Sequence, residues 1–251
     1  MGYPHLPKAP IVEGLIDIHV KQRPELSLDD LAPFTEALRS SYPDVKDLRE
    51  IHAQFVVSDD PKALPSNSGP KEIPRVGHRF ERPSPHFVVH ARRSELLVSK
   101  LRPYDSWETL AAEARATWTT YRDILKPEAI TRVATRFVNR LELPLKGLDF
   151  DEYLSAPPLI PKGLPQVFDN FMTRIIVPDA NSGSRIAISQ VLEGPNPQSD
   201  TISVLIDIDV FKEVDIDVAS EELWQLLARM RDIKNRAFFD SVTQRALELF
   251  R

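Results

Sequence analysis

Three ionisable residues recur along one short stretch near the start of the chain: Glu13, Asp17 and His19 lie within residues 10–20. In a β-strand their side chains would point to the same face, because successive side chains alternate. Glu13 and Asp17 would then be about 13 Å apart, too far for the carboxylate pair of a glycosidase. Asp17 and His19 would be about 7 Å apart, and could share a metal ion only if other ligands converged on it. No second group has ligand spacing, so we predict no metal site and no cofactor.

A second set of residues is basic: Arg132, Arg136 and Arg140 recur every four positions within residues 129–144. The β-branched and aromatic residues between them favour a strand, on which the three arginines would share a face. Such a face can bind a phosphate, a carboxylate-rich partner or nucleic acid. Alternatively, acidic side chains across the strands pair with it, at about 0.2–1 kcal/mol per pair. If the strand of Asp17 lies beside this one, the two faces neutralise each other, and we favour this ladder over a catalytic site.

A third feature is the junction at residues 101–110, where Tyr104 and Trp107 precede and begin a helical pattern. The N-terminus of a helix presents free N–H groups that bind anions, so the two rings can border a ligand site. Packing of both rings in the core, with their polar ends satisfied at its rim, is the commoner arrangement. We favour the packing interpretation and keep the ligand site as the alternative.

A fourth feature is the basic stretch at residues 229–236, inside the last helical pattern. It can contact the phosphates of a nucleic acid, although a solvated helix face with ion pairs is the commoner meaning. The formal net charge of the chain is −5, which argues against a general nucleic-acid binder, since such proteins need a basic field.

The composition is that of a globular protein: 42% of the 251 residues are hydrophobic and 27% are charged, enough to bury a core. The chain has no cysteine, which excludes disulfides, thiolate metal sites and a cysteine nucleophile, and fits a cytoplasmic location. The first ten residues lack the pattern of a signal peptide. No apolar run approaches the roughly 20 residues that span a bilayer, so we expect no membrane partner.

The first part of the chain, residues 1–127, alternates apolar and polar residues in short runs and ends in a long amphipathic pattern. In order, we predict a strand at 11–20, a helix within 27–43, strands at 49–58, 75–82, 85–92 and 94–101, and a helix within 102–127.

The second part, residues 128–251, repeats this order. Its closing helix is about 30 residues long, which exceeds the usual length, so we expect a bend near Asn235. In order, we predict a strand at 129–144, a short helical turn within 149–165, strands at 168–179, 184–192 and 200–213, and a helix at 220–250.

This order predicts an α+β fold in which helices pack on one face of an extended antiparallel sheet. The two halves, 1–127 and 128–251, share the plan of strand, short helix, antiparallel meander and long helix. We therefore predict an internal duplication. The first strands of the two halves can pair, which would fuse both halves into one compact unit with a shared sheet.

Three motifs resemble those of a sporadically distributed family of bacterial and archaeal proteins, about 250 residues long and without an assigned activity. The resemblance covers the whole chain in order and implies a single domain, but no catalytic residues to carry over. The patchy distribution of the family suggests mobile cassettes of the toxin–antitoxin or phage-defence type. The matching residues are Pro10, Ile11, Glu13, Ile16 and Asp17, then Pro103, Tyr104 and Trp107, then Arg132, Arg136, Phe137, Asn139 and Arg140.

Two hypotheses of function follow. The first is a non-catalytic binding module that holds a protein partner, a second copy of itself or a small anionic ligand, with Arg132, Arg136 and Arg140 as contacts. The alternative is an enzyme acting on a phosphate-bearing small molecule or nucleic acid. In that enzyme Glu13, Asp17 and His19 would supply acid–base or metal chemistry, and the arginines would stabilise transition-state charge.

Overall fold

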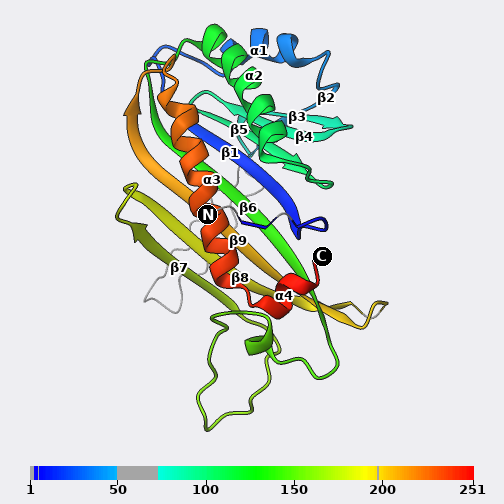
Figure 1. The fold of residues 1–251 in the computed structure, drawn as a ribbon. Coiled ribbons are helices and arrows are strands. Elements are labelled where there is room, and N and C mark those ends of the chain that lie inside the picture. The colour runs from blue at the N-terminus through cyan, green and yellow to red at the C-terminus, as the bar shows by residue number, and fades with distance from the viewer. Residues whose placement is uncertain (1–2, 5, 50–72, 197) are drawn as a thin grey trace, which may run out of the picture.

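A single antiparallel sheet dominates the computed structural model, which describes residues 3–4, 6–49, 73–196 and 198–251 (Figure 1). Its strand order is β2-β3-β4-β5-β1-β6-β9-β8-β7, and every neighbouring pair is antiparallel. The strands are β1 (Ile11–Lys21), β2 (Asp44–Arg49), β3 (Arg75–Pro83), β4 (His86–Arg92), β5 (Glu95–Leu101), β6 (Ala129–Pro144), β7 (Met172–Asp179), β8 (Ser184–Asn196) and β9 (Thr201–Ile216).

The helices lie on one side of this sheet, where the long α2 and α3 run across it (Figure 1). The α+β class and the extended antiparallel sheet are therefore confirmed. None of the described helices is both long and apolar enough to cross a membrane. The helices are α1 (Ala32–Leu38), α2 (Trp107–Leu125), α3 (Glu222–Ser241) and α4 (Gln244–Glu248), with short 3-10 turns at Asp29–Leu31 and Phe150–Glu152.

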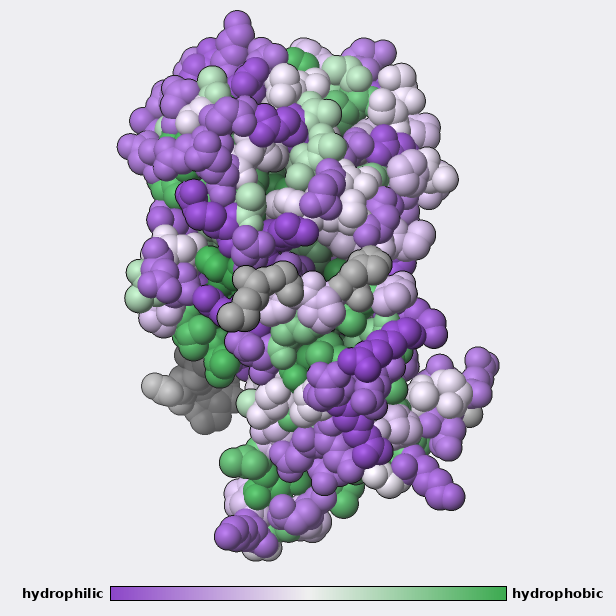
Figure 2. Space-filling view, in the orientation of Figure 1, coloured by the Kyte–Doolittle hydropathy of each residue, from purple (hydrophilic) through white to green (hydrophobic). Residues whose placement is uncertain are grey.

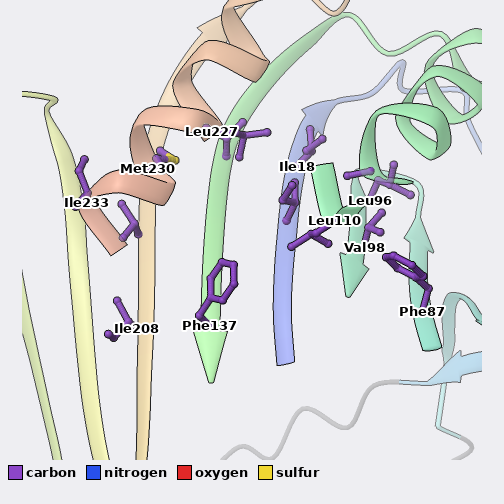
Figure 3. Packing of buried hydrophobic residues seen from close by; sticks show 14 of the residues in the cluster. Ile18, Phe87, Leu96, Val98, Leu110, Phe137, Ile208, Leu227, Met230 and Ile233 are labelled. Carbon is purple, nitrogen blue, oxygen red and sulfur yellow. The ribbon is translucent and has the colours of Figure 1, made fainter. Parts of the chain in front are cut away.

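The core fills the space between the helices and the near face of the sheet. Leu110 of α2 and Leu227 and Met230 of α3 are fully buried against apolar side chains of the central strands (Figure 3). Leu227 and Met230 are three residues apart, a spacing that places both on the buried stripe of α3. In β1, Ile16 and Ile18 join this core, so Asp17 and His19 belong to the far face of the sheet, opposite to α2 and α3.

The two halves meet at the centre, where β1 pairs with β6. The strands of the first half follow β1 outward to β2, and those of the second half follow β6 outward to β7. The internal duplication and the division at residue 127 stay predictions. The strand expected at 49–58 lies, beyond its first residue, outside the described residues.

The closing helix breaks later than expected. Instead of bending near Asn235, α3 continues to Ser241, and Val242 then adopts an extended conformation and bridges to Leu154. The side chain of Thr243 caps the short α4 by accepting a hydrogen bond from the backbone N–H of Ala246. The long helix therefore ends at Val242 and Thr243, two β-branched residues, because threonine favours the N-cap position over the helix interior.

Candidate functional site

The predicted acidic and basic residues meet on the far face of the sheet. The register places His19 opposite Arg132 and Leu15 opposite Arg136. Nη1 of Arg132 donates to Oδ2 of Asp17 at 2.6 Å, and only 8% of Asp17 is exposed. The expected pairing of the Asp17 strand with the Arg132 strand is thus confirmed, and this contact is a largely buried, charge-assisted hydrogen bond.

The other two arginines contact acidic side chains of β6, β8 and β9. Arg136 forms a bidentate pair with Asp207 of β9, with Nε and Nη2 at 2.7 and 2.6 Å from the two carboxylate oxygens. Nε of Arg140 lies 3.0 Å from carboxylate oxygens of both Glu142 and Glu193. We call the five residues Asp17, His19, Arg132, Arg136 and Asp207 the charge ladder.

Glu13 does not join these pairs as a direct partner. The pKa of Arg136 is raised mainly by the hydrogen bond to Asp207, and the negative charge of Glu13 raises it further. The structure therefore brings together Asp17, His19 and Arg132, and leaves Glu13, Arg136 and Arg140 in separate contacts.

His19 is the one residue of the ladder whose charge can change near neutral pH. Its Nε2 lies 3.0 Å from Oδ2 of Asp17, and this hydrogen bond raises the pKa of His19. Asp17, His19 and Glu95 of β5 offer ligand atoms within 4.8 Å of one another. However, the Arg132 guanidinium already occupies Oδ2 of Asp17, and its positive charge opposes a cation at that position. The ladder therefore fits an internal ion-pair network better than a metal site.

A second group of polar residues lines a cavity of about 840 Å³ on the helix side of the sheet. Its walls are the N-terminal segment before β1, the turn between β5 and α2, the middle of β6 and one face of α3. Tyr3 lines the cavity and stacks on Phe239, with 4.7 Å between the ring centroids. We call this cavity the α2–α3 pocket. Figure 2 shows the same side of the molecule, where hydrophobic residues reach the surface between hydrophilic ones.

The pocket is basic. Among the described lining residues, four side chains are basic and two are acidic, Asp105 and Glu108. The basic residues are Lys8, Arg102, Arg231 and Lys234. Ser106 caps α2 by accepting a hydrogen bond from the N–H of Thr109, so the helix also directs the positive end of its dipole toward this region. The charges and the helix end together favour an anionic ligand.

Lys234 is the most unusual residue of the pocket. Only 7% of it is exposed, and among the described residues no carboxylate lies within ion-pair distance of its Nζ. Burial, assisted by the charge of Arg231, lowers the pKa of Lys234 to about 7. Its Nζ lies 3.7 Å from the centre of the Phe137 ring, a contact that favours the charged form. A buried lysine of this kind is uncommon, because an unpaired charge is costly to remove from water.

Two aromatic rings, Tyr104 and Trp107, pack against the Phe137 ring that Lys234 contacts. The Tyr104 ring packs edge to face against the Phe137 ring, with 5.5 Å between the ring centroids, and the centroid of the Trp107 ring lies 6.4 Å from that of Phe137. Gly14 of β1 leaves the space for both rings, since a Cβ there would lie 2.7 Å from Phe137 and 2.8 Å from Tyr104. Burial also raises the pKa of Tyr104, so its hydroxyl stays protonated and can donate a hydrogen bond. The two rings of the junction therefore pack against the core and also line a cavity, and the ligand site at the junction stays a prediction.

The sequence prediction missed Lys234 and Arg231 as site residues and saw them only as part of a basic stretch. The available signal was the position of Lys234 on the apolar stripe of α3, four residues after Met230 and seven after Leu227. A lysine at such a position must either reach solvent or lie in a special environment. The basic residues of α3 also separate in space, because Arg236 pairs with Asp179 at 2.6 Å, outside the pocket.

Comparison with known protein-family models gives no match, and comparison with curated proteins finds no similar sequence. The resemblance carried by the three motifs therefore stays a prediction. Residues of all three motifs lie in or against the α2–α3 pocket: Pro10 and Ile11, then Pro103, Tyr104 and Trp107, then Phe137 and Asn139.

Proposed function

We propose that this protein is a non-catalytic binding module that holds a small anionic ligand in the α2–α3 pocket. The observation that carries the proposal is the buried, carboxylate-free ammonium of Lys234 in a cavity that Arg102 and Arg231 also line. A cavity of about 840 Å³ lies within the range of small-molecule sites, roughly 300–1,000 Å³. A cytoplasmic location, indicated by the lack of cysteine, is part of this proposal, and the association with a mobile cassette rests on the resemblance alone.

The three arginines of the far face support the pocket as the binding site by contrast with Lys234, which has no carboxylate within ion-pair distance among the described residues. Arg132, Arg136 and Arg140 each already contact at least one carboxylate. An anion at any of them would have to displace an internal partner, and the desolvated pair with Asp17 would be the most costly to break. The same pairing weighs against the enzymatic alternative, which requires Asp17 and His19 to be available to a substrate. We therefore move the ligand contacts from the three arginines to the pocket.

The test is isothermal titration of inorganic phosphate, succinate and phenyllactate into the protein and three variants. Lys234→Met and Arg231→Met remove cations of the pocket, whereas Arg136→Met removes an arginine of the ladder as a matched control. We expect at least one probe to bind, and both pocket variants to lose at least tenfold in affinity while Arg136→Met binds normally. Binding of no probe, or an equal loss in Arg136→Met, would rule the proposal out.

A protein partner is the second candidate ligand, and the end of the sheet favours it. β7 is the last strand of the sheet, and Met172, Ile175 and Ile176 on it are all more than half exposed. An apolar edge strand is a template for pairing with another chain. A second copy of this chain fits, because antiparallel pairing of β7 with itself continues both faces of the sheet. Sedimentation velocity should show a dimer that Ile175→Lys dissociates, and a monomer at all concentrations would refute this pairing.

A further inference from the structure

The chemistry of Lys234 suggests more than electrostatic attraction. Its ammonium has no carboxylate partner among the described residues, and its Nζ rests on an aromatic ring next to an open cavity. Arg231 precedes it by three residues, so both side chains lie on the same face of α3. A lysine that is desolvated beside another cation is the arrangement that activates the amine as a nucleophile toward carbonyl groups.

The walls of the pocket indicate what else such a ligand carries. Arg102 offers its guanidinium group to a carboxylate, and Arg231 adds a second one, although its Nη2 also lies 3.6 Å from Oε1 of Glu108. Trp107, Phe238 and Phe239 offer apolar and aromatic surface, which suits a ligand with a hydrophobic body. A carbonyl compound that is at once anionic and apolar satisfies both sets of residues.

We propose that the α2–α3 pocket binds an oxo acid with an apolar or aromatic body, and that Lys234 captures its carbonyl group as a Schiff base. This inference rests on the proposed function, since the acid must first bind in the pocket as an anion. It adds that the ligand is held by a reversible covalent bond.

The reaction needs no oxidant or reductant. The lone pair of the neutral Nζ attacks the carbonyl carbon, and the C=O π electrons become those of an alkoxide that is protonated by the proton released from nitrogen. The resulting carbinolamine loses one molecule of water, and a C=N bond forms between the ligand and Nζ. Hydrolysis reverses the sequence. Depression of the pKa of Lys234 to about 7 supplies neutral amine at physiological pH, whereas an ordinary lysine is almost fully protonated.

The test uses phenylpyruvate as the probe and cyanoborohydride to reduce any imine to a stable secondary amine, followed by peptide mapping by mass spectrometry. We expect one adduct per chain, located on Lys234 and formed at least tenfold faster than on exposed lysines such as Lys146. Phenyllactate, which has a hydroxyl in place of the carbonyl, should slow the labelling by competition. Labelling that spreads over exposed lysines, with Lys234 no faster than the rest, would overturn the inference.

The variant Lys234→Arg separates covalent capture from binding, because it keeps the positive charge but cannot form an imine. We expect it to give no adduct at the pocket with phenylpyruvate, while phenyllactate, which cannot form an imine, measures the non-covalent binding that remains. If the wild-type protein binds phenyllactate but forms no adduct with phenylpyruvate, covalent capture is wrong and the proposed function stands. If it binds neither but binds inorganic phosphate or succinate, only the present inference fails. If it binds none of these probes, both fail. The mapping of the wild-type protein decides the matter even if Lys234→Arg does not fold.

Discussion

The two sides of the sheet differ in whether a buried charge has a partner of opposite charge. On the far face, the buried Asp17 and the partly buried Arg132 are joined at 2.6 Å, so the cost of removing each charge from water is offset by the other. On the helix side, Lys234 is buried to a similar extent as Asp17, has no such partner among the described residues, and lies against a ring and a cavity instead. Charges in a row on a strand can therefore be paired within the protein, whereas a buried cation that faces a cavity without a carboxylate partner stays available to a ligand.

The largest expected effect concerns the ring that supports Lys234. Phe137→Ala should lower the free energy of unfolding by about 3–5 kcal/mol, because it removes a fully buried aromatic side chain and leaves a cavity. Phe87→Ala is the matched control, since this ring is equally buried but lies outside the pocket. Urea unfolding should give similar losses for both, while only Phe137→Ala should abolish binding of phenyllactate. Equal binding by the two variants would break the link between the ring and the pocket.

The next effect tests the cost of the unpaired lysine. The difference between a pKa of 10.5 and one of about 7 corresponds to roughly 5 kcal/mol, at about 1.4 kcal/mol per pKa unit. Between pH 7 and 10.5 the unfolded chain binds a proton at Lys234 that the folded chain does not, so the free energy of unfolding rises with pH. This stability is fully present above pH 10.5 and is lost as the pH falls to about 7.

Lys234→Met should therefore raise the free energy of unfolding at pH 7, by about 1–4 kcal/mol. It should also flatten the rise in stability between pH 7 and 10. Lys146→Met, at an exposed lysine, should change neither. Denaturant unfolding at a series of pH values measures both quantities. A loss of stability in Lys234→Met would mean that the ammonium has a favourable partner, and the contrast between the two sides would disappear.

The smallest effects concern the charge ladder. Asp17→Asn should cost about 1–3 kcal/mol, because it leaves the guanidinium of Arg132 partly buried with weaker partners, Asp209 at 3.9 Å and Glu213 at 3.8 Å. Arg136→Gln should cost less than about 1 kcal/mol, since nearly half of the Arg136 side chain is exposed. Thermal unfolding at pH 7 ranks the two. The reverse order would show that burial does not determine the strength of these pairs.

The charge ladder was partly predictable because strands alternate with a period of two, which assigns each charge to a face from the sequence alone. The pairing of Asp17 with Arg132 required only that β1 and β6 be neighbours. The partner of Arg136 was not predictable, because Asp207 comes beside it only through the order β1-β6-β9. Short-range patterns carry no information about that order.

The α2–α3 pocket was harder to predict for the same reason. Its walls come from segments around Pro10, Tyr104, Asn139 and Lys234, which are far apart in the sequence and meet only in the folded chain. Tyr104 and Trp107 were recognised because the start of a helix has a local signature. Lys234 was overlooked among neighbouring basic residues, although its place on the apolar stripe of α3 distinguishes it from Arg229 and Arg236.

The most direct test of the contrast between the two sides is an NMR pH titration of the lysine side chains, with Lys234→Met used to assign the signal of Lys234. We predict that one lysine titrates with a midpoint near pH 7, that this signal is absent from the variant, and that phenyllactate raises its midpoint by stabilising the ammonium. A midpoint for Lys234 above pH 10 would refute the contrast between the two sides, because it would show an ammonium as well stabilised as one in water.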